Sequence, residues 1–194
     1  MPLILETIVT TLNADGSPHL VPFGLIREGD GYVVAPFRPS PTIANLERHP
    51  YLAAATPADI RVLAGCVTGR RDWATVPCER VPVGRLAEAY AHLELAVGES
   101  TDDPVRPRFR CRVVHAASHR PVIGDNRARA AVIEAAILST RLGMLPAEKI
   151  RAEMAYLAIA VEKTAGPTEA EAWSWIEAKI NAALDPDRND VQVA

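Results

Sequence analysis

The strongest constraint on the fold is a single change in hydrophobic period, which falls near Gly124. Before it, short runs of alternating or β-branched residues are separated by turn sequences, a pattern typical of antiparallel strands. After it, apolar residues recur at helical spacing as far as Leu184. The sequence therefore predicts a mainly β, α+β protein in which strands come first and helices follow.

The strand-forming part predicts a barrel of about six strands. Asn, Asp and Gly fill the first two turns, 13–16 and 28–31, which favours a meander with short connections. One short helix interrupts it, with Ser40 as N-cap and Pro41 at the first helical position, and Pro50 ends that helix. The expected strands cover residues 5–12, 19–26, 32–36, 51–56, 88–97 and 108–114.

The last two strands read as a long hairpin with one buried and one wet face. In the first of them we expect the apolar set to be buried and the alternate set, Tyr90, His92 and Glu94, to be exposed to water. That exposed face could supply part of a subunit contact.

Three helices are expected after Gly124. Asp125 or Asn126 caps the first, which runs to about Leu142, and Pro146 and Pro167 open the other two. Their apolar side chains are too many for an independent tail, because each is worth about 1.5–3 kcal/mol when buried. The expected organisation is a split-barrel domain over residues 1–122, a helical extension over 123–185 packed on the barrel, and a polar tail over 186–194.

Composition excludes several classes of partner. The net charge is −3 and aromatic residues make up only 5% of the chain, so neither a basic field nor a stacking platform favours nucleic acid. No run approaches the roughly 20 apolar residues of a membrane helix. Three widely spaced cysteines give no disulfide framework and suit a reducing compartment. We therefore expect a cytoplasmic protein with no nucleic-acid or membrane partner.

The most informative segment joins the third strand to the short helix. Arg38 supplies a fixed positive charge, Ser40 and Thr42 supply hydroxyls, and a helix N-terminus supplies amides and a positive dipole. A phosphate group is recognised by these features together. The same residues are also compatible with an ordinary capped helix beside a surface arginine, so both interpretations stay open at this point.

The order of these elements resembles the FMN-binding split barrel of flavin reductases and pyridoxamine phosphate oxidases. More closely, the chain is similar to an archaeal and methylotroph family of FMN-binding split-barrel proteins long catalogued as a domain of unknown function. The similarity covers residues 5 to 178, and the segments on which it rests are 6–11, 22–24, 38–45, 85–94, 126–128, 133–142 and 162–167.

The resemblance implies a homodimer with FMN near the subunit interface. It places the FMN phosphate at Arg38, Ser40 and Thr42, in the segment that also contains Asn45, and the isoalloxazine ring against Pro22, Phe23 and Gly24. Pro39 and Pro41 depart from the family pattern, because they remove two amide donors from the phosphate loop.

The resemblance also bears on the first helix after Gly124. Asn126 and Arg127 at its start are candidate walls of the flavin pocket. The alternative is a solvated or dimer-facing stripe of charges in which Arg127 shares a helix face with Glu134 and Arg141.

The function implied is that of an FMN-dependent oxidoreductase acting on an unidentified small molecule, for which a pterin is one candidate. The alternative is a flavin-binding accessory or pathway protein without turnover. No acid or base residue is singled out. The five histidines show no metal-binding spacing, so no metal site is expected, and neither a hydrolase elbow nor a P-loop is present.

Overall fold

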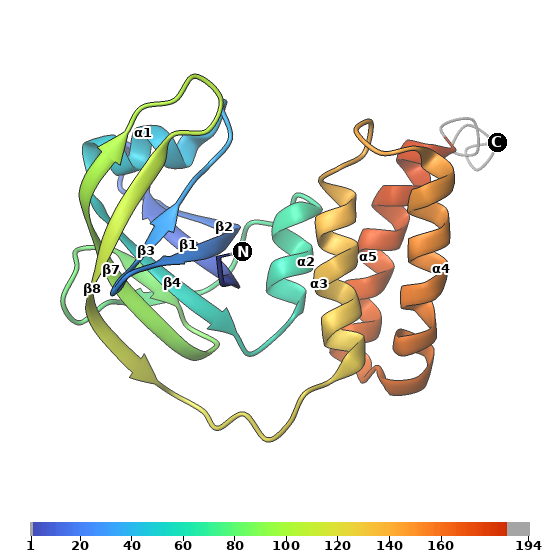
Figure 1. Ribbon diagram of the computed structural model, residues 1–194. Helices are drawn as coiled ribbons and strands as arrows, with labels where there is room; N and C mark the ends of the chain where they lie inside the picture. The colour runs from blue at the N-terminus through green and yellow to red at the C-terminus, as the bar shows by residue number, and fades with distance from the viewer. Residues whose placement is uncertain (1, 186–194) are drawn as a thin grey trace. The chain divides into compact units, whose positions relative to one another are not determined.

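The computed structural model describes residues 2–185 and divides them into two compact units (Figure 1). One unit consists of residues 2–58 and 72–121, and the other of residues 59–71 and 122–185. The predicted polar tail, 186–194, lies outside the described residues. No helix within residues 2–185 is long and apolar enough to cross a membrane.

The first unit is a closed antiparallel barrel, which confirms the predicted split-barrel, α+β fold. Every neighbouring pair of strands around the ring is antiparallel. The order around the barrel is β1 (Ile4–Leu12), β2 (Pro18–Glu28), β3 (Gly31–Val34), β8 (Arg108–Ser118), β7 (Ala89–Thr101) and β4 (Tyr51–Pro57).

The turns of the meander have the residues that their geometry requires. Gly16 and Gly29 adopt positive φ angles of 82° and 57°, which cost a glycine little. In the first turn the Asn13 amide donates to the Ser17 carbonyl at 2.9 Å, and Asp15 accepts from the Ser17 hydroxyl at 2.6 Å. Local chemistry therefore sets the register of β1 against β2.

The barrel interior is one apolar cluster that also takes in side chains of α1 (Pro41–Arg48). Ile43 and Leu46 of this helix are almost completely buried in the cluster. Its strand members include Val9, Leu25, Val34, Leu52, Leu95 and Phe109. Because α1 is attached through its own apolar face, its N-terminus has a fixed position on the barrel.

A second, two-stranded sheet packs on the outside of the barrel and was not predicted. It consists of β5 (Thr75–Pro77) and β6 (Gly84–Leu86), and the loop between them buries Val81 and Val83 against Ala53 of β4. This excursion overturns the expectation of a wet face on β7. His92 is only 2% exposed and Glu94 is fully buried, and Tyr90 is half-buried.

The second unit consists of four helices: α2 (Arg61–Val67), α3 (Arg127–Ser139), α4 (Ala147–Thr164) and α5 (Pro167–Leu184). The predicted starts are close to those observed, and Asn126 is the N-cap of α3, where its side chain accepts a hydrogen bond from the Arg129 amide. Helix α2 was not predicted. Residues 59–71, which the sequence assigned to the barrel, cluster instead with the helices.

Helix α3 ends three residues earlier than predicted. Thr140 is the C-cap, its hydroxyl donates to the Ile137 carbonyl at 2.7 Å, and Gly143 adopts a φ of 81° in the turn that follows. Arg141 therefore lies outside the helix. The predicted stripe of Arg127, Glu134 and Arg141 on one helix face does not form.

Candidate functional site

The N-terminus of α1 holds two hydroxyls with unusual surroundings. Ser40 is the N-cap in an extended conformation, but its side chain makes no capping hydrogen bond. Thr42 is fully buried, and its hydroxyl oxygen has no hydrogen-bond partner among residues 2–185. An unpaired buried hydroxyl costs about 1–3 kcal/mol, and Thr10 of β1 shares this state, so the feature does not by itself mark a ligand site.

Two guanidinium groups lie at the same junction, where the sequence had suggested one. Arg38 forms an ion pair with Asp102 at 2.8 Å and donates to the Asp103 carbonyl at 3.2 Å. Arg106 lies over the Phe37 ring, 4.6 Å from its centroid, and donates to the Ala35 carbonyl. The Asp102 side chain is 88% exposed, so its pairing with Arg38 contributes little and can be exchanged for another anion.

The loop that positions Arg106 is held by Asp103. Its carboxylate accepts hydrogen bonds from the Arg106 amide at 2.7 Å and the Val105 amide at 2.8 Å. These hydrogen bonds, with a contribution from the charge of Arg38, hold the pKa of Asp103 below its usual value. The backbone of Arg38 also donates to the Val105 carbonyl at 2.9 Å, which joins the two loops.

Asn45 has a positioning role in this structure. Its buried amide nitrogen donates to the Thr11 hydroxyl at 3.0 Å and to the Asn13 side-chain oxygen at 3.2 Å. Both partners lie at the end of β1 or in the turn after it. These bonds connect α1 to β1 and fix the direction of the helix.

Pro22, Phe23 and Gly24 lie on β2, paired with β1. Phe23 packs against the barrel cluster that includes Ile43 of α1. A Cβ on Gly24 would come within 2.5 Å of the Ile4 side chain, so the glycine accommodates the neighbouring strand. Because Ile26 pairs with Val33, the chain beyond β3 runs back toward this middle part of β2.

Asn126 and Arg127 belong to the helical unit. The Asn126 side chain accepts from the Arg129 amide and donates to the Thr164 carbonyl, each at 3.0 Å, so it is occupied by the helix cap. Arg127 is exposed.

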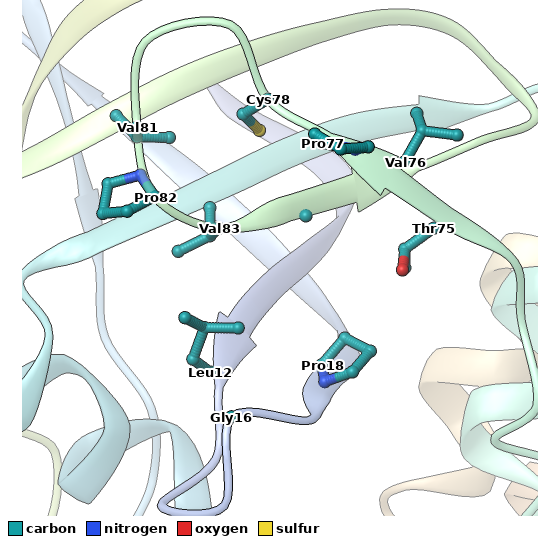
Figure 2. A pocket seen from close by; sticks show the side chains of 11 residues that line it. Leu12, Gly16, Pro18, Thr75, Val76, Pro77, Cys78, Val81, Pro82 and Val83 are labelled. Atoms are coloured by element: carbon teal, nitrogen blue, oxygen red, sulfur yellow. The ribbon is translucent and has the colours of Figure 1, made fainter.

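A pocket of about 490 Å³ lies on the barrel unit between the β1–β2 turn and the β5–β6 hairpin (Figure 2). It contains none of the predicted site residues. The wall has no charged side chain; it is made of Leu12, Gly16, Pro18, Thr75, Val76, Pro77, Cys78, Val81, Pro82, Val83 and Gly84. Its size suits a small ligand, but its chemistry does not suit a phosphate.

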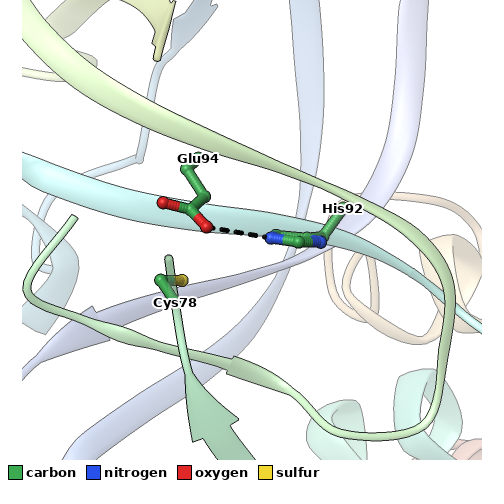
Figure 3. Close-up of side chains that lie close together, drawn as sticks. All are labelled: Cys78, His92 and Glu94. Atoms are coloured by element: carbon green, nitrogen blue, oxygen red, sulfur yellow. Dashed lines mark hydrogen bonds and ion pairs between the residues drawn. The ribbon is translucent and has the colours of Figure 1, made fainter. Parts of the chain in front are cut away.

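Beside this pocket, a buried polar cluster is built around Glu94. The carboxylate accepts hydrogen bonds from three successive amides, those of Glu79 and Arg80 at 2.7 Å and of Val81 at 3.0 Å. His92 lies with Nε2 3.2 Å from the carboxylate, as Figure 3 shows. Burial raises the pKa of Glu94, but these hydrogen bonds outweigh it and the pKa is lowered overall.

The cluster extends on both sides of His92. On one side, Nδ1 of His92 lies 2.9 Å from Nε2 of His119, and the planes of the two rings are only 13° from parallel. On the other side is Cys78, where burial, with the nearby charge of Glu94, raises the pKa of the thiol to about 12. Sequence spacing gave no sign of this cluster, because Cys78 comes from the inserted hairpin and His119 follows the end of β8.

Family comparison accounts for nearly the whole chain. Residues 5–120 match the N-terminal domain of DUF447, described as a protein of unknown function, and residues 126–178 match the second DUF447 segment. The chain belongs to the DUF447 family. No curated protein matches it.

Solved structures share the DUF447 chain's fold at low sequence identity. An FMN-bound DUF447 protein from Methanosarcina mazei superposes with a TM-score of 0.77 at 20% identity, covering 92% of this chain and 96% of its own. The 2-nitrobenzoate 2-nitroreductase of Pseudomonas fluorescens gives 0.53 at 17% identity, with 61% and 66% coverage. A flavoredoxin from Methanosarcina acetivorans gives 0.52 at 17% identity, with 63% and 75% coverage.

Replacing the central carboxylate of the buried cluster tests its structural role. Glu94→Gln should lower the free energy of unfolding by about 2–4 kcal/mol, because the amide substitute brings an NH₂ group among three donors and removes the charge that they stabilise. Denaturant unfolding with a metal chelator present measures the change. Glu99→Gln, at an 82% exposed position on the same strand, is the control and should change stability by less than about 0.5 kcal/mol. Equal effects of the two variants would contradict the structural role of the Glu94 carboxylate.

Proposed function

We propose that this protein binds FMN at the junction between β3 and α1 and acts as an FMN-dependent oxidoreductase. The observation that supports this most directly is the α1 N-terminus, where the Ser40 side chain makes no capping hydrogen bond and Arg38 is held only by an exposed carboxylate and a backbone carbonyl. The FMN-bound DUF447 structure from Methanosarcina mazei and the redox proteins that share the fold support the same assignment.

The side chains at the junction fit a phosphate monoester. Arg38 would exchange its exposed partner Asp102 for the phosphate, the Thr42 hydroxyl would donate to a phosphate oxygen, and Ser40 offers a second hydroxyl. Arg106 supplies further positive charge. The helix dipole adds to these contacts, although Pro39 and Pro41 lack amide donors. We assign the isoalloxazine ring of FMN to the Pro22–Gly24 segment of β2.

This assignment gives FMN and the protein chain different roles. FMN, when bound, supplies hydride or electron transfer, while the chain binds and orients it and sets the charge around it. The substrate is a small molecule, with a pterin as the candidate that the family resemblance suggests. A flavin-binding accessory protein without turnover is the alternative.

The phosphate contacts are tested by two substitutions. Arg38→Ala should weaken FMN binding by about 1.5–3 kcal/mol, the scale of a hydrogen bond to a charged group, and Thr42→Val should weaken it by less. Fluorescence titration of the flavin measures both. Arg108→Ala is the control, since this arginine pairs with Glu28 at the end of β2. Unchanged binding in Arg38→Ala would show that the phosphate lies elsewhere.

The same titration decides between the two interpretations of Arg127. If Arg127 is a surface charge, Arg127→Ala leaves FMN affinity and melting temperature nearly unchanged. If it forms a wall of the flavin pocket, affinity falls tenfold or more with the fold intact.

Turnover is tested by anaerobic reduction. The purified protein should show the absorbance bands of an oxidised flavin, and these should bleach on addition of NADH or NADPH. Bands that persist with both donors would favour the accessory protein over the oxidoreductase.

We also infer that the protein is a cytoplasmic homodimer. Phe37 and Val105, which flank the junction, are 60% and 61% exposed, an apolar surface that a second subunit could cover. Light scattering at micromolar concentration should give about twice the chain mass of 21.0 kDa. A monomer that still binds FMN tightly would contradict the interface site.

A further inference from the structure

We propose that Cys78, His92 and Glu94 form a binding site for a divalent transition-metal ion of the Zn²⁺ type. The site lies between β7 and the β5–β6 hairpin, within the barrel unit. It shares no residue with the proposed phosphate site, so the metal assignment and the flavin assignment can be tested independently.

The donor atoms are already gathered. One ligand atom from each of the three residues lies within 4.8 Å of the others, and Figure 3 shows the Cys78 sulfur beside the His92–Glu94 pair. Nε2 of His92 and Oε1 of Glu94 are 3.2 Å apart. Two such ligands of a tetrahedral Zn²⁺ are separated by about 3.3 Å, so only the thiol must shift, by roughly 1 Å.

The donors are also oriented from behind, as metal ligands usually are. The amides of residues 79–81 hold the Glu94 carboxylate, and His119 contacts the Nδ1 atom of His92, which leaves Nε2 directed toward the carboxylate and the thiol. Both His92 and Glu94 are fixed in the protein interior before any ion arrives.

A second observation concerns His115, a further imidazole beside the three proposed ligands. His115 pairs in register with Glu94, and its buried Nε2 atom has no hydrogen-bond partner; its ion-pair contact with Glu79 is 3.5 Å long. The ring centroids of His92 and His115 are 6.0 Å apart, so His115, which contacts Glu79, lies beside the proposed site.

Charge balance favours a divalent ion. A thiolate, a carboxylate and a neutral imidazole carry a combined charge of −2, which Zn²⁺ neutralises in a buried location where net charge is costly. Coordination by Cys78 releases the thiol proton to solvent. Cys78 also lines the 490 Å³ pocket, so one of the three proposed ligands borders a cavity (Figure 2).

Calorimetric titration with Zn²⁺ tests the proposal on the full chain after chelator treatment and dialysis. The wild type should bind one equivalent. Cys78→Ala and His92→Gln should each weaken binding at least tenfold, whereas Cys66→Ser, which alters a thiol of the helical unit, should leave it unchanged. Circular dichroism in chelator checks that the variants are folded.

A measurement on the unaltered protein supplements the variants. Mass spectrometry of the alkylated wild type should show that Zn²⁺ protects Cys78 and not Cys66. Absence of a one-equivalent site, binding that survives Cys78→Ala, or equal alkylation of Cys78 with and without Zn²⁺ would each overturn the proposal, and the cluster would then be a hydrogen-bonded network only.

Discussion

Closure of the barrel is the constraint on which the proposed flavin site depends. The ring closes where β1 pairs with β4 over only three residue pairs, Ile8 with Ala55, Val9 with Ala54 and Thr10 with Ala53. Helix α1 lies in the connection between β3 and β4. The pairing of β4 with β1 therefore determines where the chain rejoins the barrel after the helix. Ile43 and Leu46 then fill the interior, and Asn45 bonds to the end of β1. Tertiary packing therefore sets the orientation of the β3–α1 junction, where we propose that the phosphate binds.

Local chemistry made much of the fold predictable from the sequence. Glycines at positive φ, the N-caps of α1 and α3, and prolines at helix starts act within a few residues, so the sequence displays them directly. The proposed phosphate junction could be named from the sequence for the same reason, because Arg38, Ser40 and Thr42 are close in the chain. Helix α2 is seven residues long and was not recognised, since so short a segment gives little periodic signal.

Non-local contacts account for what sequence reasoning missed. The alternation in β7 correctly separated two faces, but it could not reveal that the β5–β6 excursion covers the second one. Glu94 looked like a surface residue because a charged side chain is rarely buried without partners. Its partners are backbone amides, which leave no trace in residue identity. The second guanidinium of the junction, Arg106, was hidden in a loop far from Arg38 in the sequence.

The placement of α2 with the helical unit means that neither unit is one continuous piece of chain. The polypeptide passes from one unit to the other at 58–59, 71–72 and 121–122. During synthesis, α2 emerges long before α3 and α5. Its apolar residues Val62, Leu63 and Ala64 therefore have no helix to pack against until those two helices have been made. A fragment that stops at residue 120, although it matches a family domain by itself, would leave this helix unpaired. The two units are therefore coupled through their connectivity, because cutting the chain between residues 121 and 122 separates α2 from the helices that cluster with it.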